Sequence, residues 1–246
     1  MDLYFDCAWG ISGDMTIAAL LDSGASFERL SRELRKLSLT GYALRYTKTE
    51  KDGAIMSDFD VLIDPDAYDN HVQRNYYDVR KLITESPLSR KIKERACAVL
   101  GIAACSQAKA HGVAKSGVYF HETGAIDSIV DIVGTAICLE DLHAGHIFSS
   151  PLTEGTGTIK YRYGRLPVPV PATKNTLTDH GIPYGVTDVK QELITPTGAA
   201  IAAALFEDFF PKQQLEEKGY SILRSGKGAG KREYGKGGFL QCHALG

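Results

Sequence analysis

The sequence predicts an α/β fold with a central mixed sheet flanked by helices and a second half rich in glycine and proline. Three observations support this prediction. Short apolar segments that suit strands alternate with longer segments of helical periodicity. The dipeptide Asp52-Gly53 separates two strand-like runs, which is a hairpin signal. From Gly155 onward, closely spaced glycines and prolines break the chain into short strands and turns.

In the first half of the chain, strands and helices are expected to alternate. Apolar residues at helical spacing predict helices at 14–24, 27–37, 78–84, 86–110 and 125–142. Runs of strand-forming residues predict strands at 3–5, 42–49, 55–63, 118–121 and 147–148. Asp14 suits the N-cap of the first helix, and Ser86 followed by Pro87 suits the start of the fourth. The polar stretch 64–75 is expected to be a loop.

The second half has a different composition, and we place a subdomain boundary near residue 150. Helices are expected at 171–178 and 199–210, and a strand is expected at 184–186. The segment 226–246 begins with many glycines and lysines, so it is predicted to be a flexible tail.

Composition excludes several classes of protein. The 246 residues include 28 Lys and Arg against 30 Asp and Glu, a net charge of −2, so no basic field exists to hold a nucleic-acid backbone. Acidic residues interrupt the longest apolar stretches, and the acidic N-terminus is unlike a signal peptide. Five cysteines without a CxxC pair are typical of reduced thiols. The sequence therefore predicts a cytoplasmic protein with no nucleic-acid or membrane partner.

The first group of chemically interesting residues lies where the first strand turns into the first helix. Asp6 ends the strand, Gly10 and Gly13 form a turn, and Ser12 and Asp14 flank the helix start. Free backbone N–H groups at such a start favour a phosphate, and the carboxylates suit a metal ion. Asp6, Ser12 and Asp14 are therefore candidate catalytic residues, and Gly10 and Gly13 are candidate phosphate-binding residues. The alternative is that Asp14 only caps the helix and the glycines only turn the chain.

The second group contains His121, Glu122, Asp127 and Asp131. The predicted helix 125–142 is apolar on almost all sides, so it should be buried, yet Asp127 and Asp131 stand one turn apart on the same face. Two buried like charges need a positive partner. An imidazole and carboxylates suit a divalent metal such as nickel, zinc or manganese. The alternative is that the two aspartates cap the helix and form salt bridges with Arg or Lys.

Two further segments could bind phosphate. Thr195 before Pro196 suits a helix start, so Thr197 and Gly198 could bind a phosphate or carboxylate through backbone amides, although a capping role explains the same pattern. The glycine-rich stretch 225–232 lacks the order of a Walker motif. It is interpreted as a flexible basic linker whose Lys231 and Arg232 could reach a phosphate.

Taken together, these motifs resemble the LarC family of nickel insertion proteins over nearly the whole chain. The motifs that carry the resemblance are Phe5-Asp6-Cys7, Gly10-Ile11-Ser12-Gly13-Asp14-Met15, His111-Gly112-Val113, Phe120-His121-Glu122, Asp127-Ser128-Ile129-Val130-Asp131-Ile132, Leu166-Pro167-Val168-Pro169-Val170-Pro171, Thr195-Pro196-Thr197-Gly198 and Gly226 to Arg232. The chain departs from the family in two places. The family's histidine-rich run is reduced here to His71, and its His-Gly before the proline motif is Tyr163-Gly164.

The resemblance implies a chemistry. The family inserts nickel into pyridinium-3,5-bisthiocarboxylic acid mononucleotide, with CTP, to form the nickel pincer cofactor of lactate racemase. It implies a nickel chelatase of the lyase class, of which this chain is the N-terminal portion. The CTP site, with Mg or Mn, belongs to a C-terminal portion that acts as a partner, and a homo-oligomer is a further expected partner. The alternatives are a metal-dependent phosphohydrolase and a non-catalytic nickel metallochaperone or assembly module.

Overall fold

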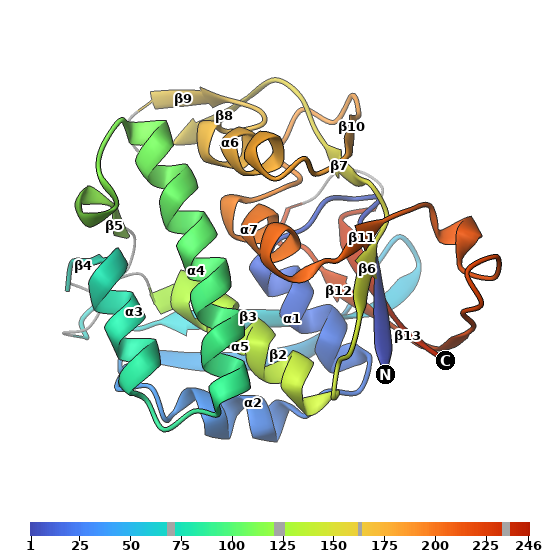
Figure 1. The fold of residues 1–246 in the computed structure, drawn as a ribbon, viewed down its shortest axis with the longest axis horizontal. Helices are drawn as coiled ribbons and strands as arrows, with labels where there is room; N and C mark the ends of the chain where they lie inside the picture. The colour runs from blue at the N-terminus through green and yellow to red at the C-terminus, as the bar shows by residue number, and fades with distance from the viewer. Residues whose placement is uncertain (68–71, 121–125, 162–163, 233–236) are drawn as a thin grey trace.

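The computed structural model describes residues 1–246 except 68–71, 121–125, 162–163 and 233–236. A seven-stranded mixed sheet in the order β11-β6-β1-β13-β12-β3-β2 organises it (Figure 1). Its strands are β1 (Asp2–Asp6), β2 (Tyr42–Lys51), β3 (Ala54–Ile63), β6 (Ile147–Ser149), β11 (Asp208–Phe209), β12 (Ile222–Ala229) and β13 (Phe239–Leu245). The prediction of an α/β fold with a central mixed sheet is confirmed.

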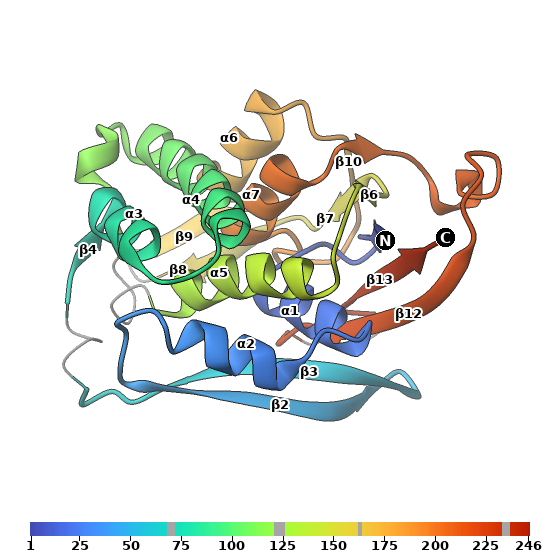
Figure 2. The same ribbon diagram turned by 60° about the horizontal axis from the view of Figure 1, so that its bottom comes forward.

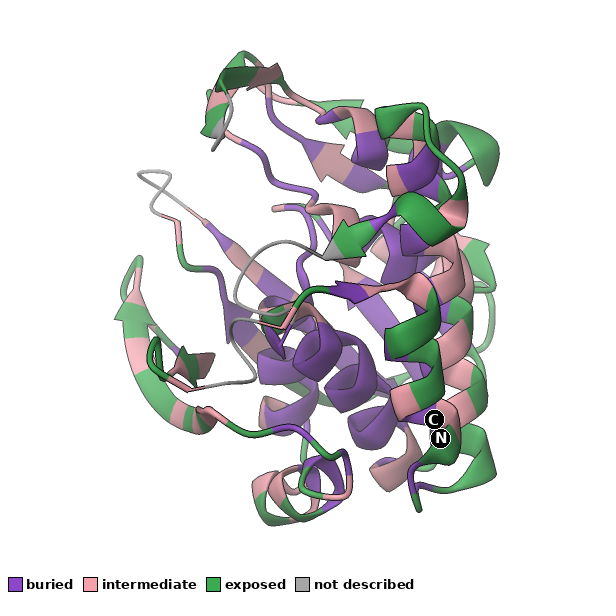
Figure 3. Cartoon of the chain, turned by 90° about the vertical axis from the view of Figure 1, so that its left-hand side faces the viewer, coloured by how far each residue is buried: buried purple, intermediate pink, exposed green. Residues whose placement is uncertain are grey.

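The helices pack in layers over this sheet. They are α1 (Gly13–Asp22), α2 (Phe27–Leu34), α3 (Tyr76–Glu85), α4 (Arg90–His111), α5 (Ile126–Asp141), α6 (Pro171–Asp179) and α7 (Pro196–Leu205). In Figure 2, α1, α2 and α5 lie directly over β2 and β3, and α3, α4, α6 and α7 lie beyond them. Figure 3 shows that the buried residues concentrate in the central elements and the exposed ones in the outer helices and hairpins. The inner helices α1 and α5 are buried on almost all sides, as the sequence predicts for α5.

Three small two-stranded sheets complete the fold. They pair β4 (Arg74–Asn75) with β5 (Tyr119–Phe120), β7 (Leu152–Glu154) with β10 (Tyr184–Val186), and β8 (Thr158–Tyr161) with β9 (Gly164–Pro167). One hydrophobic core joins residues from both halves of the chain, among them Leu3, Leu152 and Ile194. The subdomain boundary near residue 150 stays a prediction. Across the described ranges, no helix is both long and apolar enough to cross a membrane.

Two helix starts differ from the prediction. Ser12, rather than Asp14, caps α1, because its Oγ accepts a hydrogen bond from the amide of Met15 at 3.4 Å. Asp14 already lies in the first turn and accepts a hydrogen bond from the Ser12 hydroxyl. Ser86 ends α3 instead of starting α4, since a residue before proline favours extended backbone, and Ser89 caps α4.

The last predicted helix is shorter than expected. The sequence predicted a helix over 199–210, but α7 ends at Leu205. Phe206 has extended backbone, and the amide of Glu207 then donates to the carbonyl of Ile147 at 2.8 Å. Pairing with the edge of the large sheet therefore outweighs the helical tendency of this apolar run.

The prediction of a flexible tail over 226–246 is wrong for β12 and β13. β13 lies at the centre of the large sheet, antiparallel to both β1 and β12. The glycines of β12 serve packing, because a Cβ on Gly226 would overlap the amide of Ser23 and one on Gly228 would overlap the carbonyl oxygen of Met15. Their absent side chains let α1 lie directly on β12, a tertiary reason that local composition does not reveal.

Replacing Gly228 with alanine is expected to lower the free energy of unfolding by about 2–3 kcal/mol, as overpacking of a closed core does. Urea denaturation measures this change. Gly185→Ala is the control, since Gly185 lies on exposed β10, where an added Cβ would meet no atom within 4 Å, and should change stability by less than about 0.5 kcal/mol. Equal effects of both substitutions would contradict the packing role of Gly228.

Candidate functional site

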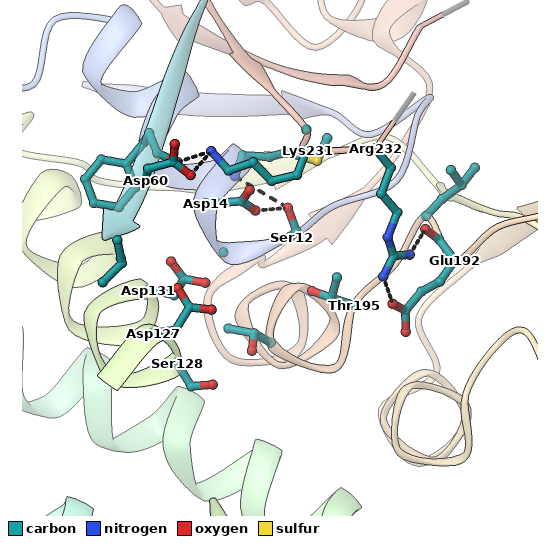
Figure 4. A pocket seen from close by; sticks show the side chains of 17 residues that line it. Ser12, Asp14, Asp60, Asp127, Ser128, Asp131, Glu192, Thr195, Lys231 and Arg232 are labelled. Atoms are coloured by element: carbon teal, nitrogen blue, oxygen red, sulfur yellow. Dashed lines mark hydrogen bonds and ion pairs between the residues drawn. The ribbon is translucent and has the colours of Figure 1, made fainter. Parts of the chain in front are cut away.

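A cavity of about 420 Å³ opens where α1, α5 and α7 begin, beside β3 and the end of β12 (Figure 4). Five carboxyl groups line it, and they belong to Asp14, Asp60, Asp127, Asp131 and Glu192. Two cations also line it, Lys231 and Arg232. Among the described residues, the lining is therefore acidic, which favours a positively charged ligand.

The local backbone brings two helix starts together at this cavity. Gly10 has φ +79°, and a Cβ there would overlap the carbonyl of Leu193. Ile11 forms a parallel bridge with Ile194, with Ile11 N donating to Leu193 O at 3.0 Å and Thr195 N donating to Ile11 O at 3.1 Å. The first turn of α1 and that of α7 therefore face the same space.

Asp131 is the most unusual carboxyl group of the cavity. It is 7% exposed, and its Oδ1 has no hydrogen-bond partner in the part of the chain that the structure describes. It packs directly on Gly13, where a Cβ would overlap its carboxyl group. Burial first, and then the charges of Asp127 and Asp14, raise the pKa of Asp131 well above its usual value, against the opposing effect of Lys231.

Asp127 differs from the prediction that both aspartates of this helix are buried. It lies one residue after the start of α5 and is exposed. Its carboxyl group lies beside that of Asp131 in Figure 4, and both line the cavity. The one-turn spacing thus places the two groups on one face, as predicted, but at the rim and the interior respectively.

Asp14 and Ser12 form a third part of the acidic wall. The hydroxyl of Ser12 donates to the Asp14 carboxylate. Burial raises the pKa of Asp14, while the bond from Ser12 and the charge of Lys231 act in the opposite direction. The protonated form of Asp14 is therefore more favoured than that of an exposed aspartate.

The two cations of the cavity are engaged by other groups of the chain. Lys231 donates to Asp58 at 2.7 Å and to the carbonyl of Phe59 at 2.7 Å, and it also pairs with Asp60. Arg232 donates to the carbonyl of Glu192 at 2.7 Å and to its carboxylate at 2.9 Å. Within the described ranges, Asp131 therefore forms no salt bridge with either cation, unlike the alternative proposed for it.

The structure gathers most of the predicted site residues but not all. Those that line the cavity are Ser12, Gly13, Asp14, Asp127, Asp131 and Thr197. Asp6 pairs with Lys212 at 2.9 Å and does not line it, so its catalytic role stays a prediction.

The remaining predicted residues lie elsewhere. Gly10 packs against backbone and does not line the cavity. The amide of Gly198 donates to Thr195 Oγ1 at 3.1 Å, which is the capping alternative for this motif, so it is engaged within the helix start. His121 and Glu122 fall outside the described residues.

The described carboxylates do not form a preassembled metal cage. Within the part of the chain that the structure describes, no group of three or more His, Cys, Asp or Glu is close enough to hold a metal ion as it stands. The charges of Asp14 and Asp127 instead favour the protonated form of Asp131 while no cation is bound.

Sequence reasoning did not single out Asp60, which lines the cavity, Glu192 as an ion-pair partner, or the fully buried Glu154. Asp58 and Asp60 alternate with apolar residues along β3, a pattern that usually marks a solvated strand face. Glu154 follows an ordinary strand-forming pair and carries no local signal. The contacts of these residues are made with segments that are distant in sequence, so they become visible only in the folded chain.

Comparisons with known proteins give the relationship. Residues 3–243 match the family model described as nickel insertion protein. The chain is 39% identical to the pyridinium-3,5-bisthiocarboxylic acid mononucleotide nickel insertion protein of Alkaliphilus metalliredigens, with 99% of this chain and 60% of the relative covered. It is 41% identical to the protein of the same name from Acetivibrio thermocellus (98% and 59% covered) and 41% identical to that from Geobacillus kaustophilus (94% and 56% covered).

The chain thus spans 56–60% of the length of these three relatives. No solved structure matches it.

Proposed function

The chain belongs to the nickel insertion protein family, and from this premise we propose that its acidic cavity binds Ni²⁺ for insertion into pyridinium-3,5-bisthiocarboxylic acid mononucleotide. That substrate is the one named for its relatives. Nickel is the cargo of this reaction rather than a permanent part of the protein.

Asp131 carries the proposal. A buried carboxyl group with an oxygen that lacks a partner among the described residues, next to two further carboxyl groups, lowers its energy by binding a cation. Asp127 at the rim would supply a further oxygen donor.

Oxygen donors alone suit Mg²⁺ or Mn²⁺ as well as they suit Ni²⁺. We assign the choice of nickel to an imidazole, and His121, which precedes α5, is the predicted donor together with Glu122. The described carboxylates would neutralise the charge of the bound ion, and the imidazole would favour Ni²⁺ over Mg²⁺ or Mn²⁺.

The mononucleotide would bind on the other side of the cavity. Thr195 and Thr197 carry hydroxyl groups at the start of α7, and Arg232 lines the same cavity. These groups suit the phosphate and ribose of a mononucleotide, since a helix start favours an anion. Gly13 lies against Asp131 on the proposed metal side of the cavity, so its predicted role in binding phosphate stays a prediction.

Formation of a carbon–nickel bond displaces a proton from the ring carbon, and a base must take it. Asp14 is our candidate for this base, because its carboxylate lines the cavity and its pKa is raised. Ser12 would orient Asp14 through their hydrogen bond. The ring carbon loses H⁺ to Asp14 as it gains nickel, so charge and atoms balance.

CTP dependence, with Mg or Mn, would come from the remaining portion of the longer relatives, acting with this chain to complete a lyase-type chelatase. The cofactor product would serve lactate racemase.

The test incubates the purified chain with Ni²⁺ and the mononucleotide, with and without the separately produced remaining portion of a relative plus CTP. Appearance of the nickel–ligand absorption of the product, with its mass, only in the complete mixture supports the proposal. Release of phosphate from the mononucleotide with Mg²⁺ or Mn²⁺ alone would indicate the phosphohydrolase alternative. Ni²⁺ binding without product in any mixture would indicate a metallochaperone.

A further inference from the structure

Glu154, the last residue of β7, is fully buried and lies outside the cavity lining. Its Oε1 accepts three backbone N–H groups, from Gly155 at 2.8 Å, Leu193 at 2.7 Å and Ile194 at 3.2 Å. Its Oε2 has no hydrogen-bond partner in the part of the chain described. Burial raises the pKa of Glu154 to about 7, although the three amides oppose this rise. A buried carboxyl group with an oxygen that lacks a partner lowers the stability of the fold. Such a group is therefore a candidate for a functional role.

Two of the three amides that donate to Glu154 belong to the segment 193–195, which other parts of the chain also hold. This segment also exchanges two backbone hydrogen bonds with Ile11. The hydroxyl of Thr173 also donates to the carbonyl of Ile194 at 3.2 Å. Leu193 therefore joins Glu154, through its amide, to Ile11, through its carbonyl.

Both walls of the cavity continue directly from this joint. Ser12 and Asp14 follow Ile11 on α1, and Thr195 and Thr197 open α7. A shift of the segment 193–195 would therefore move Asp14, the proposed base, relative to the hydroxyl groups of Thr195 and Thr197.

We propose that Glu154 is a positioning residue, which fixes the starts of α1 and α7 at the spacing that ligand binding requires by gathering the amides of Leu193 and Ile194. This inference rests on the proposed function for the choice of ligand, but the positioning itself is independent of it.

Three substitutions separate positioning from burial. Glu154→Ala removes the shared acceptor, Glu154→Asp withdraws it by one methylene, and Glu154→Gln keeps an amide oxygen in the place of Oε1. Glu154→Ala and Glu154→Asp are expected to speed hydrogen exchange of the Leu193 and Ile194 amides by about tenfold or more, because local opening becomes easier. The same variants should weaken Ni²⁺ binding, measured by calorimetry, by about tenfold, as loss of supporting groups does at other metal sites. Glu154→Gln should restore both quantities to within about threefold of the unsubstituted chain.

Ile83→Ala is the control for general destabilisation, because Ile83 is buried on α3 and does not line the cavity. This substitution should lower thermal stability. It should leave the hydrogen-exchange rates of the Leu193 and Ile194 amides and the Ni²⁺ affinity unchanged. Unchanged exchange in Glu154→Asp, or equal loss of Ni²⁺ affinity in Ile83→Ala, overturns the inference. If Glu154→Ala does not fold, the comparison of Glu154→Asp with Glu154→Gln decides it. If Ni²⁺ does not bind even the unsubstituted chain, the proposed function fails, and the exchange rates still test the positioning.

Discussion

Asp131→Asn is expected to weaken Ni²⁺ binding by about a hundredfold while leaving the protein as stable as before or more stable. The asparagine has the shape of the protonated acid, which the raised pKa favours when no cation is bound. The substitution also removes repulsion from Asp14 and Asp127, so the free energy of unfolding should stay the same or rise by about 1 kcal/mol. Calorimetry with Ni²⁺ and urea denaturation measure the two quantities.

A metal-binding role of Asp131 predicts that the substitution lowers Ni²⁺ affinity without lowering stability, whereas a structural role predicts a loss of stability. If Asp131 capped the helix or formed a salt bridge, its substitution would lower the free energy of unfolding by about 1 kcal/mol or more. Glu216→Gln is the matched control, since Glu216 is exposed and the change in charge is the same. Unchanged Ni²⁺ affinity in Asp131→Asn would remove the metal site from this cavity.

The second expected result is that Ni²⁺ strengthens binding of the mononucleotide by tenfold or more, a coupling of at least about 1.4 kcal/mol. The mononucleotide carries a phosphate and two thiocarboxylates, and the described cavity presents five carboxyl groups against two cations that are already paired. The acidic lining therefore repels the mononucleotide until a bound cation offsets its charge. By linkage, the mononucleotide must strengthen Ni²⁺ binding by the same factor.

A pyridinium carboxylic acid mononucleotide without sulfur is the probe, because it isolates charge from direct sulfur–nickel bonding. Its dissociation constant is measured with and without Ni²⁺ in the unsubstituted chain and in Asp131→Asn. The coupling should be lost in the variant. Tight binding of the probe without metal would contradict an order in which nickel enters first.

The sequence predicted the layered architecture because its signals are local. The apolar helix α5 and the alternation around it follow directly from residue periodicity. The failure at β12 has a different origin, since Gly226 and Gly228 look like linker residues until α1 is placed against them. The start of α4 differs for a local reason, because Ser86 before Pro87 ends α3 and Ser89 then caps α4.

The sequence predicted the relative position of candidate residues where one helix carries them. Asp127 and Asp131 share a helix, so their spacing alone placed them on one face. The partners of Lys231 come from β3, far away in sequence, and no local pattern connects them. The role of Glu154 likewise depends on segments that meet only in the folded chain.

The central place of β13 has a consequence for biosynthesis. Asp2 pairs with Leu245, and β12 pairs with the opposite edge of the same strand. While the chain emerges from the ribosome, β1 and β12 lack the strand that lies between them. Helix α1 then lacks the completed sheet on which it packs. We therefore expect the acidic groups of the cavity to converge once β13 has been translated, so that the proposed nickel site would be absent from a half-made chain.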